Sequence, residues 1–163
     1  MLTKTETGRH LINESAYYLV VECAPQEAPI FVELRDKYLK DPKAYSKPAL
    51  VDDDPLAFGI QNVEETFVYI VFPLLNALLG YIAKQVKANL NETSIENAMQ
   101  WLRSLFQPDA RVVPLLSQAQ LIQIEVEIDA LIEQEVRRLG VKKNSATIIK
   151  NAVMARLALA KKN

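Results

Sequence analysis

Glycine, cysteine and histidine are scarce in this sequence, and each scarcity excludes a class of protein. The chain has four glycines, one cysteine and one histidine. Four glycines are few for a sheet protein with many tight turns, and too few to build a phosphate-binding loop, whereas a helical protein can turn with Asn, Asp, Ser and Pro. The single cysteine, Cys23, cannot form an intramolecular disulfide. The composition therefore favours a helical protein without a disulfide framework.

The same scarcity argues against metal and thiol chemistry. A zinc site needs several converging His, Cys or carboxylate ligands, and the chain offers one histidine, His10, and one cysteine, Cys23, thirteen residues apart. A thiol nucleophile would need His10 as its base, but His10 lies in residues 1–12, which we expect to be flexible. Free cysteine is among the most buried residue types, so we expect Cys23 in the core. We predict no catalytic residue, no metal site and no cofactor.

The acidic residues form no convincing catalytic pair or cation site. The run Asp52 to Asp54 offers oxygen ligands, but an EF-hand loop starting at Asp52 would need glycine and glutamate where the chain has Ala57 and Val63. We interpret the run as a solvated loop. Glu64 and Glu65 are adjacent on a predicted helix and point about 100° apart, so they do not face one substrate. They are better explained by stabilisation of a helix start.

Length and composition fit a single domain over residues 1–163. Half of the 163 residues are hydrophobic and about a quarter are charged, as in an ordinary globular protein. The segment from Met1 to Leu11 lacks the apolar stretch of a secretory signal peptide. We therefore expect a globular protein in the cytoplasm.

The first half of the chain predicts two helices and a long connection. The apolar run from Ala16 to Cys23 reads as a short helix that ends at Pro25, although its Tyr and Val content leaves a strand open. A second helix is expected from Gln26 or Pro29 to Lys40. Asp41 and Pro42 end it, and a surface connection follows to Leu56.

The most apolar segment is predicted to be the central helix. Asn62 and Glu65 have the spacing of a capping box, so a helix should begin there and extend to about Ala88, with a kink or break at Pro73. Residues 66–83 contain no charge. They would span about 27 Å as a helix, slightly less than the roughly 30 Å of a bilayer core. Because Pro73 is central and flanking basic residues are few, we favour a buried helix over a membrane span.

Three more helices complete the predicted bundle. Thr93 and Glu96 suggest a cap for a helix over 95–106, and Ser117 caps a long helix that Gly140 ends in a left-handed conformation. Asn144 or Ser145 should start the last helix, which folds back on the long one. We predict an all-α bundle of about six helices with a kinked apolar central helix and a C-terminal antiparallel helical hairpin. The long helix also has an acidic side, which we interpret as solvated or partner-facing: Glu125, Glu127, Asp129, Glu133 and Glu135.

Charge is distributed unevenly along the chain. Residues 136–163 contain eight basic and no acidic residues, whereas residues 1–135 have a net charge of −9. This basic C-terminal segment can dock on its own acidic body, on a second copy, or on an anionic partner. Five residues are candidates for contact with an anionic partner: Arg137, Arg138, Lys142, Lys143 and Lys150.

One stretch resembles a known family of DNA-binding proteins. Ile124, Val126 and Ile128 alternate, Leu139 and Gly140 form a turn, and a helix follows Ser145. In these features the sequence from 126 to 159 resembles ribbon-helix-helix repressors. The resemblance implies a strand that enters the DNA major groove as part of a dimer. It also implies that Gln123, Glu125 and Glu127 are the DNA readers, and two of these repel phosphate.

These observations favour a non-catalytic helical interaction or regulatory module that acts through protein–protein contacts. A homodimer would let the basic segment of one protomer meet the acidic body of the other, twice over by symmetry. Two alternatives remain: a nucleic-acid-binding regulator that uses the basic C-terminal helices, and a membrane-associated protein that uses residues 66–83. No small-molecule substrate is indicated.

Overall fold

The structure, a computed structural model, describes residues 2–45, 66–90, 93–108 and 112–159. Within these ranges it contains seven α-helices, two 3-10 helices and no β-strand, which confirms the all-α prediction. The α-helices are α1 (Glu6–Cys23), α2 (Phe31–Lys40), α3 (Pro42–Tyr45), α4 (Phe67–Asn89), α5 (Ile95–Leu105), α6 (Gln118–Leu139) and α7 (Lys143–Ala158). The 3-10 helices are η1 (Leu2–Lys4) and η2 (Pro25–Ile30).

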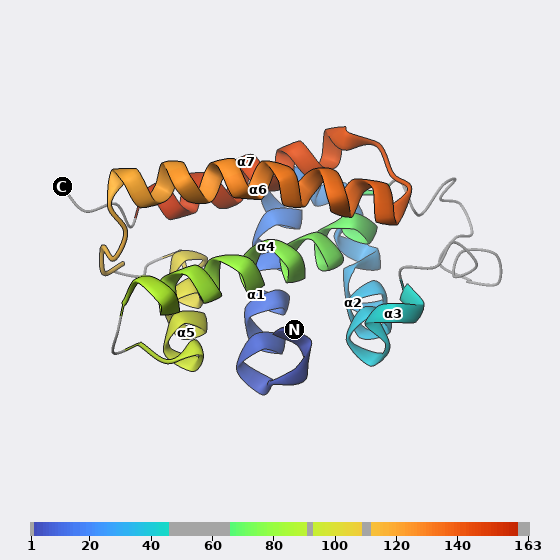
Figure 1. The fold of residues 1–163 in the computed structure, drawn as a ribbon. Coiled ribbons are helices and arrows are strands. Elements are labelled where there is room, and N and C mark those ends of the chain that lie inside the picture. The colour runs from blue at the N-terminus through green and yellow to red at the C-terminus, as the bar shows by residue number, and fades with distance from the viewer. Residues whose placement is uncertain (1, 46–65, 91–92, 109–111, 160–163) are drawn as a thin grey trace.

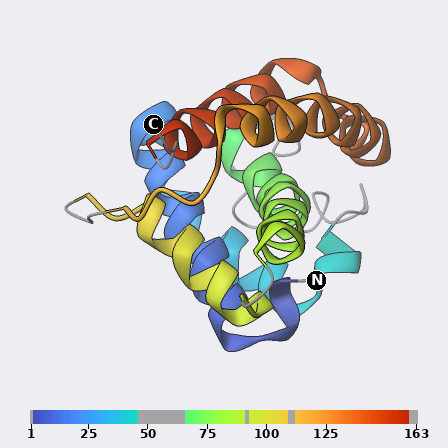
Figure 2. The same ribbon diagram turned by 60° about the vertical axis from the view of Figure 1, so that its left-hand side comes forward.

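Helix α4 lies at the centre of the molecule, and the other helices pack around it (Figure 1). Figure 2 looks nearly along α4, with α6 and α7 on one side and α1 and α5 on another. Most of the α4 side chains are buried, and with the buried apolar side chains of the neighbouring helices they form one continuous core. The apolar segment therefore supplies the surface on which the bundle assembles.

The start of α4 is set by Thr66. Its backbone is extended, and its Oγ1 accepts a hydrogen bond from the Tyr69 amide at 3.3 Å, so the helix begins at Phe67. The predicted capping box at Asn62 lies outside the described residues, as do Glu64, Glu65 and the run Asp52 to Asp54. The cap that the structure describes is therefore Thr66.

Helix α4 is continuous through Pro73, so the predicted break does not occur. Pro73 has no N–H, and the Tyr69 carbonyl four residues earlier therefore lacks its usual helical donor. The Tyr45 hydroxyl donates to that carbonyl at 2.8 Å, and the Tyr69 hydroxyl donates to the Tyr45 carbonyl at 3.0 Å. The two rings stack with centroids 4.8 Å apart. A tyrosine of α3 thus replaces the hydrogen bond that proline removes.

The N-terminal region differs from the flexible segment expected over residues 1–12. Helix α1 begins at Glu6, ten residues before the predicted start, because the Thr5 hydroxyl caps it by accepting from the Gly8 amide at 3.0 Å. Leu11 and Ile12 are fully buried. A Cβ added at Gly8 would lie 1.9 Å from the Leu2 carbonyl oxygen, so glycine is required for the close approach of η1. The helical reading of residues 16–23 is correct, and the strand reading is wrong.

Two other helices are close to their predicted bounds. The helix expected up to Lys40 is divided into η2 and α2, and α2 ends at Lys40 as predicted, with Asp41 as its C-cap. Helix α5 begins at Ile95, but its cap is Ser94, whose hydroxyl accepts from the Asn97 amide at 3.0 Å. The predicted cap one residue earlier, at Thr93, is therefore wrong.

Helices α6 and α7 pack side by side and run in opposite directions along the top of the molecule (Figure 1). Ser117 and Gln120 form a reciprocal capping box at the start of α6. Gly140 ends this helix with a φ of 67°, in the left-handed region that favours glycine. Helix α7 begins at Lys143, just before the predicted Asn144 or Ser145. Both the Ser117 cap and the Gly140 stop agree with the prediction.

Candidate functional site

Lys150, one of the five predicted anionic-partner residues, is paired within its own chain. It projects from α7 toward α6, with Nζ 2.6 Å from the Asp129 carboxylate and 3.6 Å from that of Glu125. Only 16% of the Lys150 side chain is exposed. The hydrogen bond to Asp129 raises the pKa of Lys150 above its ordinary value. This lysine therefore holds the two helices together.

Two more of the five residues have partners on α6. Lys143 forms an ion pair with Glu133, and this hydrogen bond lowers the pKa of Glu133. Arg138 pairs with Glu135 at 2.6 Å on the same helix. Glu125, Asp129 and Glu133 of α6 thus form ion pairs with lysines of α7 in their own chain, which is the first of the three docking possibilities.

The five predicted residues do not form one cluster. Arg137 and Lys142 are exposed and have no ion pair among the described residues, while the other three are neutralised by carboxylates. The positive charge available to a nucleic acid is therefore smaller than the sequence suggests. The predicted strand at Ile124, Val126 and Ile128 is part of continuous helix α6, so the ribbon of the ribbon-helix-helix resemblance is wrong.

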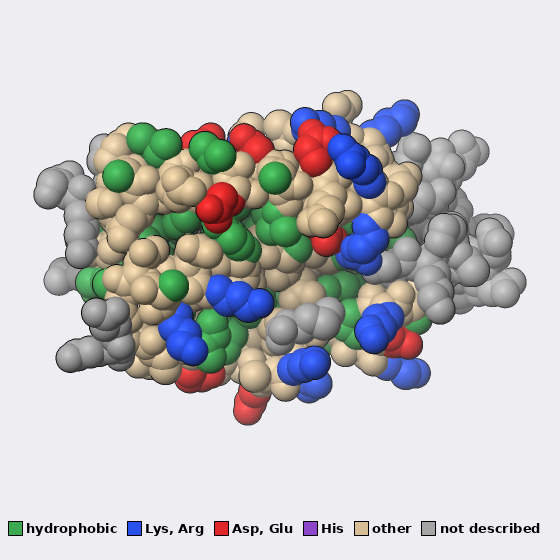
Figure 3. Space-filling view, in the orientation of Figure 1, with side chains coloured by type: hydrophobic (Ala, Val, Ile, Leu, Met, Phe, Trp, Pro, Cys, Tyr) green, Lys and Arg blue, Asp and Glu red, His purple; other side chains and the backbone are tan. Residues whose placement is uncertain are grey.

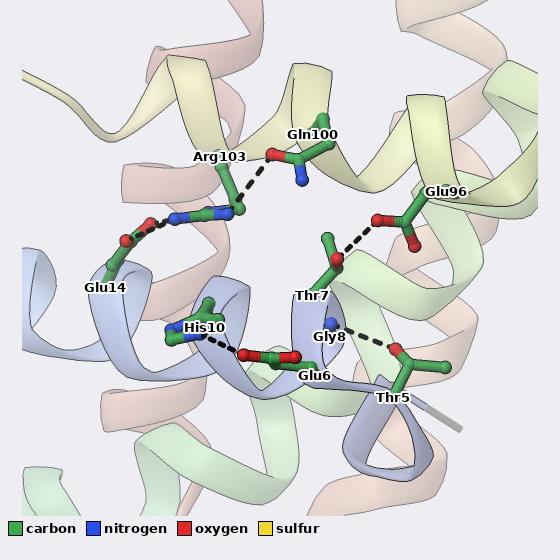
Figure 4. A network of polar contacts seen from close by, with 9 residues as sticks. All are labelled: Thr5, Glu6, Thr7, Gly8, His10, Glu14, Glu96, Gln100 and Arg103. Atoms are coloured by element: carbon green, nitrogen blue, oxygen red, sulfur yellow. Dashed lines mark hydrogen bonds and ion pairs between the residues drawn. The ribbon is translucent and has the colours of Figure 1, made fainter.

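A polar network joins α1 to α5 (Figure 4). The Glu14 carboxylate accepts two hydrogen bonds from Arg103, from Nε at 2.9 Å and from Nη2 at 2.8 Å. Gln107 donates to the same carboxylate at 3.3 Å, and Arg103 donates to Gln100 at 3.2 Å. Because the Glu14 carboxylate is already occupied by Arg103 of α5 and by Gln107, we interpret the network as a structural contact.

His10 and Cys23 are not brought together. They lie near opposite ends of α1, about 20 Å apart along the helix axis at 1.5 Å per residue. His10 is half exposed and contacts Glu6 at 3.5 Å. Cys23 is exposed, so its predicted place in the core is wrong. Desolvation and the nearby Glu22 raise the pKa of the thiol, which disfavours the nucleophilic thiolate.

The described residues contain no group of three His, Cys, Asp or Glu side chains that could hold a metal ion. Helix α4 is long and apolar enough to cross a membrane by length and composition, but 72% of its most apolar window is buried inside the protein. The core helix of a soluble protein can have the same length and composition. Helix α4 therefore gives no independent support to the hypothesis that the protein is membrane-associated.

A groove of about 460 Å³ lies between α4, the end of α6 and the start of α3. Three cations from three different helices line it: Lys43, Lys84 and Arg138. In Figure 3, Lys and Arg side chains surround a hollow in which hydrophobic side chains are visible. We call this the basic groove. Its Lys43 and Lys84 were not predicted, because the fold alone places them beside Arg138.

The inner wall of the basic groove is polar but uncharged. Tyr38 is 2% exposed, and burial raises its pKa to about 12, although a hydrogen bond from Asn76 opposes the rise. The phenol is therefore neutral at physiological pH. Asn76 is itself held in place, because its Oδ1 accepts from the Leu2 amide at 3.2 Å.

The outer side of α6 carries an unexpected apolar stripe. Ile122 and Val126 are 53% and 63% exposed. Ala119 and Ala130, also exposed, extend the stripe at helical spacing. These four residues lie opposite the face that packs on α4, whose buried residues are Leu121, Ile124, Ile128, Ile132 and Leu139. Helix α6 is thus apolar on two opposite sides; we call the exposed one the α6 stripe.

Comparison with known proteins adds no functional assignment. The sequence matches no protein-family model, no curated protein and no solved structure at a significant level. The function must therefore be argued from the surfaces and contacts of the chain itself.

Proposed function

We propose that this protein is a non-catalytic helical interaction module that associates with a second copy of itself through the α6 stripe. The observation behind this proposal is the exposure of Ile122 and Val126 on the outside of a helix that already has a complete buried face. A helix on the surface of a bundle ordinarily has one apolar face and one polar face. Covering the second apolar face with another apolar surface lowers the free energy, because it removes apolar area from water.

The α6 stripe is complementary to itself. If two α6 helices cross antiparallel with Val126 at the two-fold axis, each Ile122 lies opposite the Ala130 of the other protomer. A large side chain then meets a small one on both sides of the axis, as an isologous contact requires. Burying the exposed half of Ile122 and Val126 contributes about 1 kcal/mol for each side chain.

The charges beside the α6 stripe permit this contact. Glu125 and Asp129 flank it on the side of α7, and both carboxylates lie close to Lys150. Two copies can therefore approach with less repulsion than the acidic composition of α6 implies. Because the contact is apolar, added salt should change its affinity little.

Val126→Glu tests the proposal. The substitution places two carboxylates at the two-fold axis and should convert a dimer into a monomer, as measured by sedimentation equilibrium across a concentration series. Val32→Glu is the matched control, since it makes the same change at a valine of α2 that is 52% exposed and lies on a different helix from the stripe. Circular dichroism should show unchanged helicity for both variants, because neither residue is buried.

Two results would contradict self-association. One is a wild-type protein that remains monomeric at about 100 μM, a concentration at which a contact with micromolar affinity is largely occupied. The other is a dimer that survives Val126→Glu as well as it survives Val32→Glu.

A further inference from the structure

The basic groove has more positive charge than its own residues neutralise. Arg138 has Glu135 as a partner at 2.6 Å, and Glu135 also lines the groove. Lys43 and Lys84 have no ion pair among the described residues. Two ammonium groups from α3 and α4 therefore remain available at the rim of a concave surface.

The floor of the basic groove is apolar. Pro73, Ala77 and Gly80 of α4 lie along it, and Leu131 of α6 closes one side. These side chains are small or rigid, so they leave the space between α4 and α6 open. A volume of about 460 Å³ is within the range of small-molecule sites, which combine a largely apolar lining with a few placed polar groups.

We propose that the basic groove binds a small organic anion, with its phosphate or carboxylate group near Lys43 and Lys84 and its apolar body against the floor. Lysine suits this position because its ammonium is a flexible point charge that follows an anionic group without demanding bidentate geometry. The fixed polar wall at Tyr38 and Asn76 limits how deep the anion can enter. The basic groove shares no residue with the α6 stripe, so neither proposal depends on the other.

Isothermal titration calorimetry with four probes tests this site. Phenyl phosphate and benzoate distinguish a phosphate from a carboxylate as the preferred group. Inorganic phosphate shows whether the apolar body contributes, and benzyl alcohol shows whether the charge does. We expect saturable binding of at least one aromatic anion, weaker binding of inorganic phosphate, and no measurable binding of benzyl alcohol.

Variants at the rim of the basic groove locate the binding. Lys84→Gln and Lys43→Gln should each weaken binding of the preferred anion by about fivefold, since each removes a partly exposed charge interaction. Lys87→Gln is the control, because Lys87 is an exposed lysine of the same helix that does not line the groove. Thermal unfolding should show that all three variants remain folded.

The proposal fails if neither aromatic anion binds saturably below about 10 mM, a limit that corresponds to less than 3 kcal/mol of binding free energy. It also fails if Lys87→Gln weakens binding as much as Lys84→Gln does, since binding would then follow net charge and not the groove. A monomeric protein that binds phenyl phosphate through Lys84 would support the groove and contradict self-association, so the two outcomes are separable.

Discussion

At the scale of single residues, the carbonyl oxygen of Tyr69 depends on a donor from outside its helix. Pro73 cannot supply the donor, and the Tyr45 hydroxyl does so at 2.8 Å. Tyr45 is 1% exposed, and burial raises its pKa well above the ordinary value, so it remains a neutral donor. Tyr45→Phe should lower the free energy of unfolding by about 1–3 kcal/mol, because a buried acceptor loses its hydrogen bond. Urea denaturation would measure this loss.

A double-mutant cycle with Pro73→Ala separates this bond from the packing of the ring. Alanine at position 73 restores an N–H that can donate to the Tyr69 carbonyl. Tyr45→Phe should therefore cost less in the Pro73→Ala background than in the wild type. Equal costs in the two backgrounds would show that the hydroxyl does not replace the missing helical hydrogen bond.

At the scale of helices, the contact between α6 and α7 depends on ion pairs. Lys150→Met keeps most of the aliphatic stem but removes the charge that faces Asp129 and Glu125. The variant should lose about 1 kcal/mol of stability at neutral pH, toward the upper end for partly exposed pairs. Differential scanning calorimetry of Lys150→Met and of the exposed-site control Lys87→Met measures the difference.

The pKa shifts of Lys150 and Glu133 predict how the stability of the contact between α6 and α7 depends on pH. The pKa of Lys150 is raised in the folded protein. Its contribution to stability is therefore complete at a pH below the ordinary lysine pKa of 10.5, and it is lost as the pH rises through the raised pKa. The pKa of Glu133 is lowered in the folded protein. Its contribution to stability is therefore complete at a pH above the ordinary glutamate pKa of 4.5, and it is lost as the pH falls through the lowered pKa. Lys150→Met should therefore flatten the alkaline limb of a profile of stability against pH. A change confined to the acidic limb would contradict this assignment.

The helices that could be predicted from the sequence are those with local signals. Ser117 and Gly140 mark the ends of α6 through cap geometry that involves only neighbouring residues. The early start of α1 was missed because residues 1–12 are polar in composition. Their order comes from the cap at Thr5 and from Leu11 and Ile12, which are buried only once α4 and α5 are in place.

The candidate sites depend on tertiary structure and were predicted less well. The charge asymmetry singled out Arg138, whereas Lys43 and Lys84 join it in the basic groove only through the packing of α3, α4 and α6. Two further residues show the limits of composition. Cys23 was placed in the core from the average behaviour of its type, whereas it ends a helix at the surface. Lys150, a candidate for contact with an anionic partner, forms an ion pair with Asp129 of its own chain, which composition does not indicate.

At the scale of the whole molecule, the central position of α4 predicts cooperative unfolding. Leu78 of α4 is fully buried, and Leu78→Ala should cost about 2–5 kcal/mol. Trp101 of α5, the single tryptophan, reports on a different part of the same core. Its fluorescence and the helical circular dichroism should show the same unfolding midpoint, and Leu78→Ala should shift both equally.

Leu159→Ala is the control for this experiment, because Leu159 is 57% exposed and its truncation creates no internal cavity. It should change the midpoint little. Separate midpoints for fluorescence and circular dichroism would show that α5 unfolds independently of α4, contrary to a shared core.

The contact of Arg156 with Tyr18 has a consequence for synthesis on the ribosome. The guanidinium of Arg156 lies 5.0 Å from the centre of the Tyr18 ring, its Nη1 donates to the Tyr18 hydroxyl at 3.3 Å, and its Nε donates to the Leu105 carbonyl. Arg156 and Tyr18 are 138 residues apart in the chain. While α7 is still being translated, the ring in α1 has no cation to cover it. The contact between the first and last α-helices therefore forms only when the final helix has been synthesised.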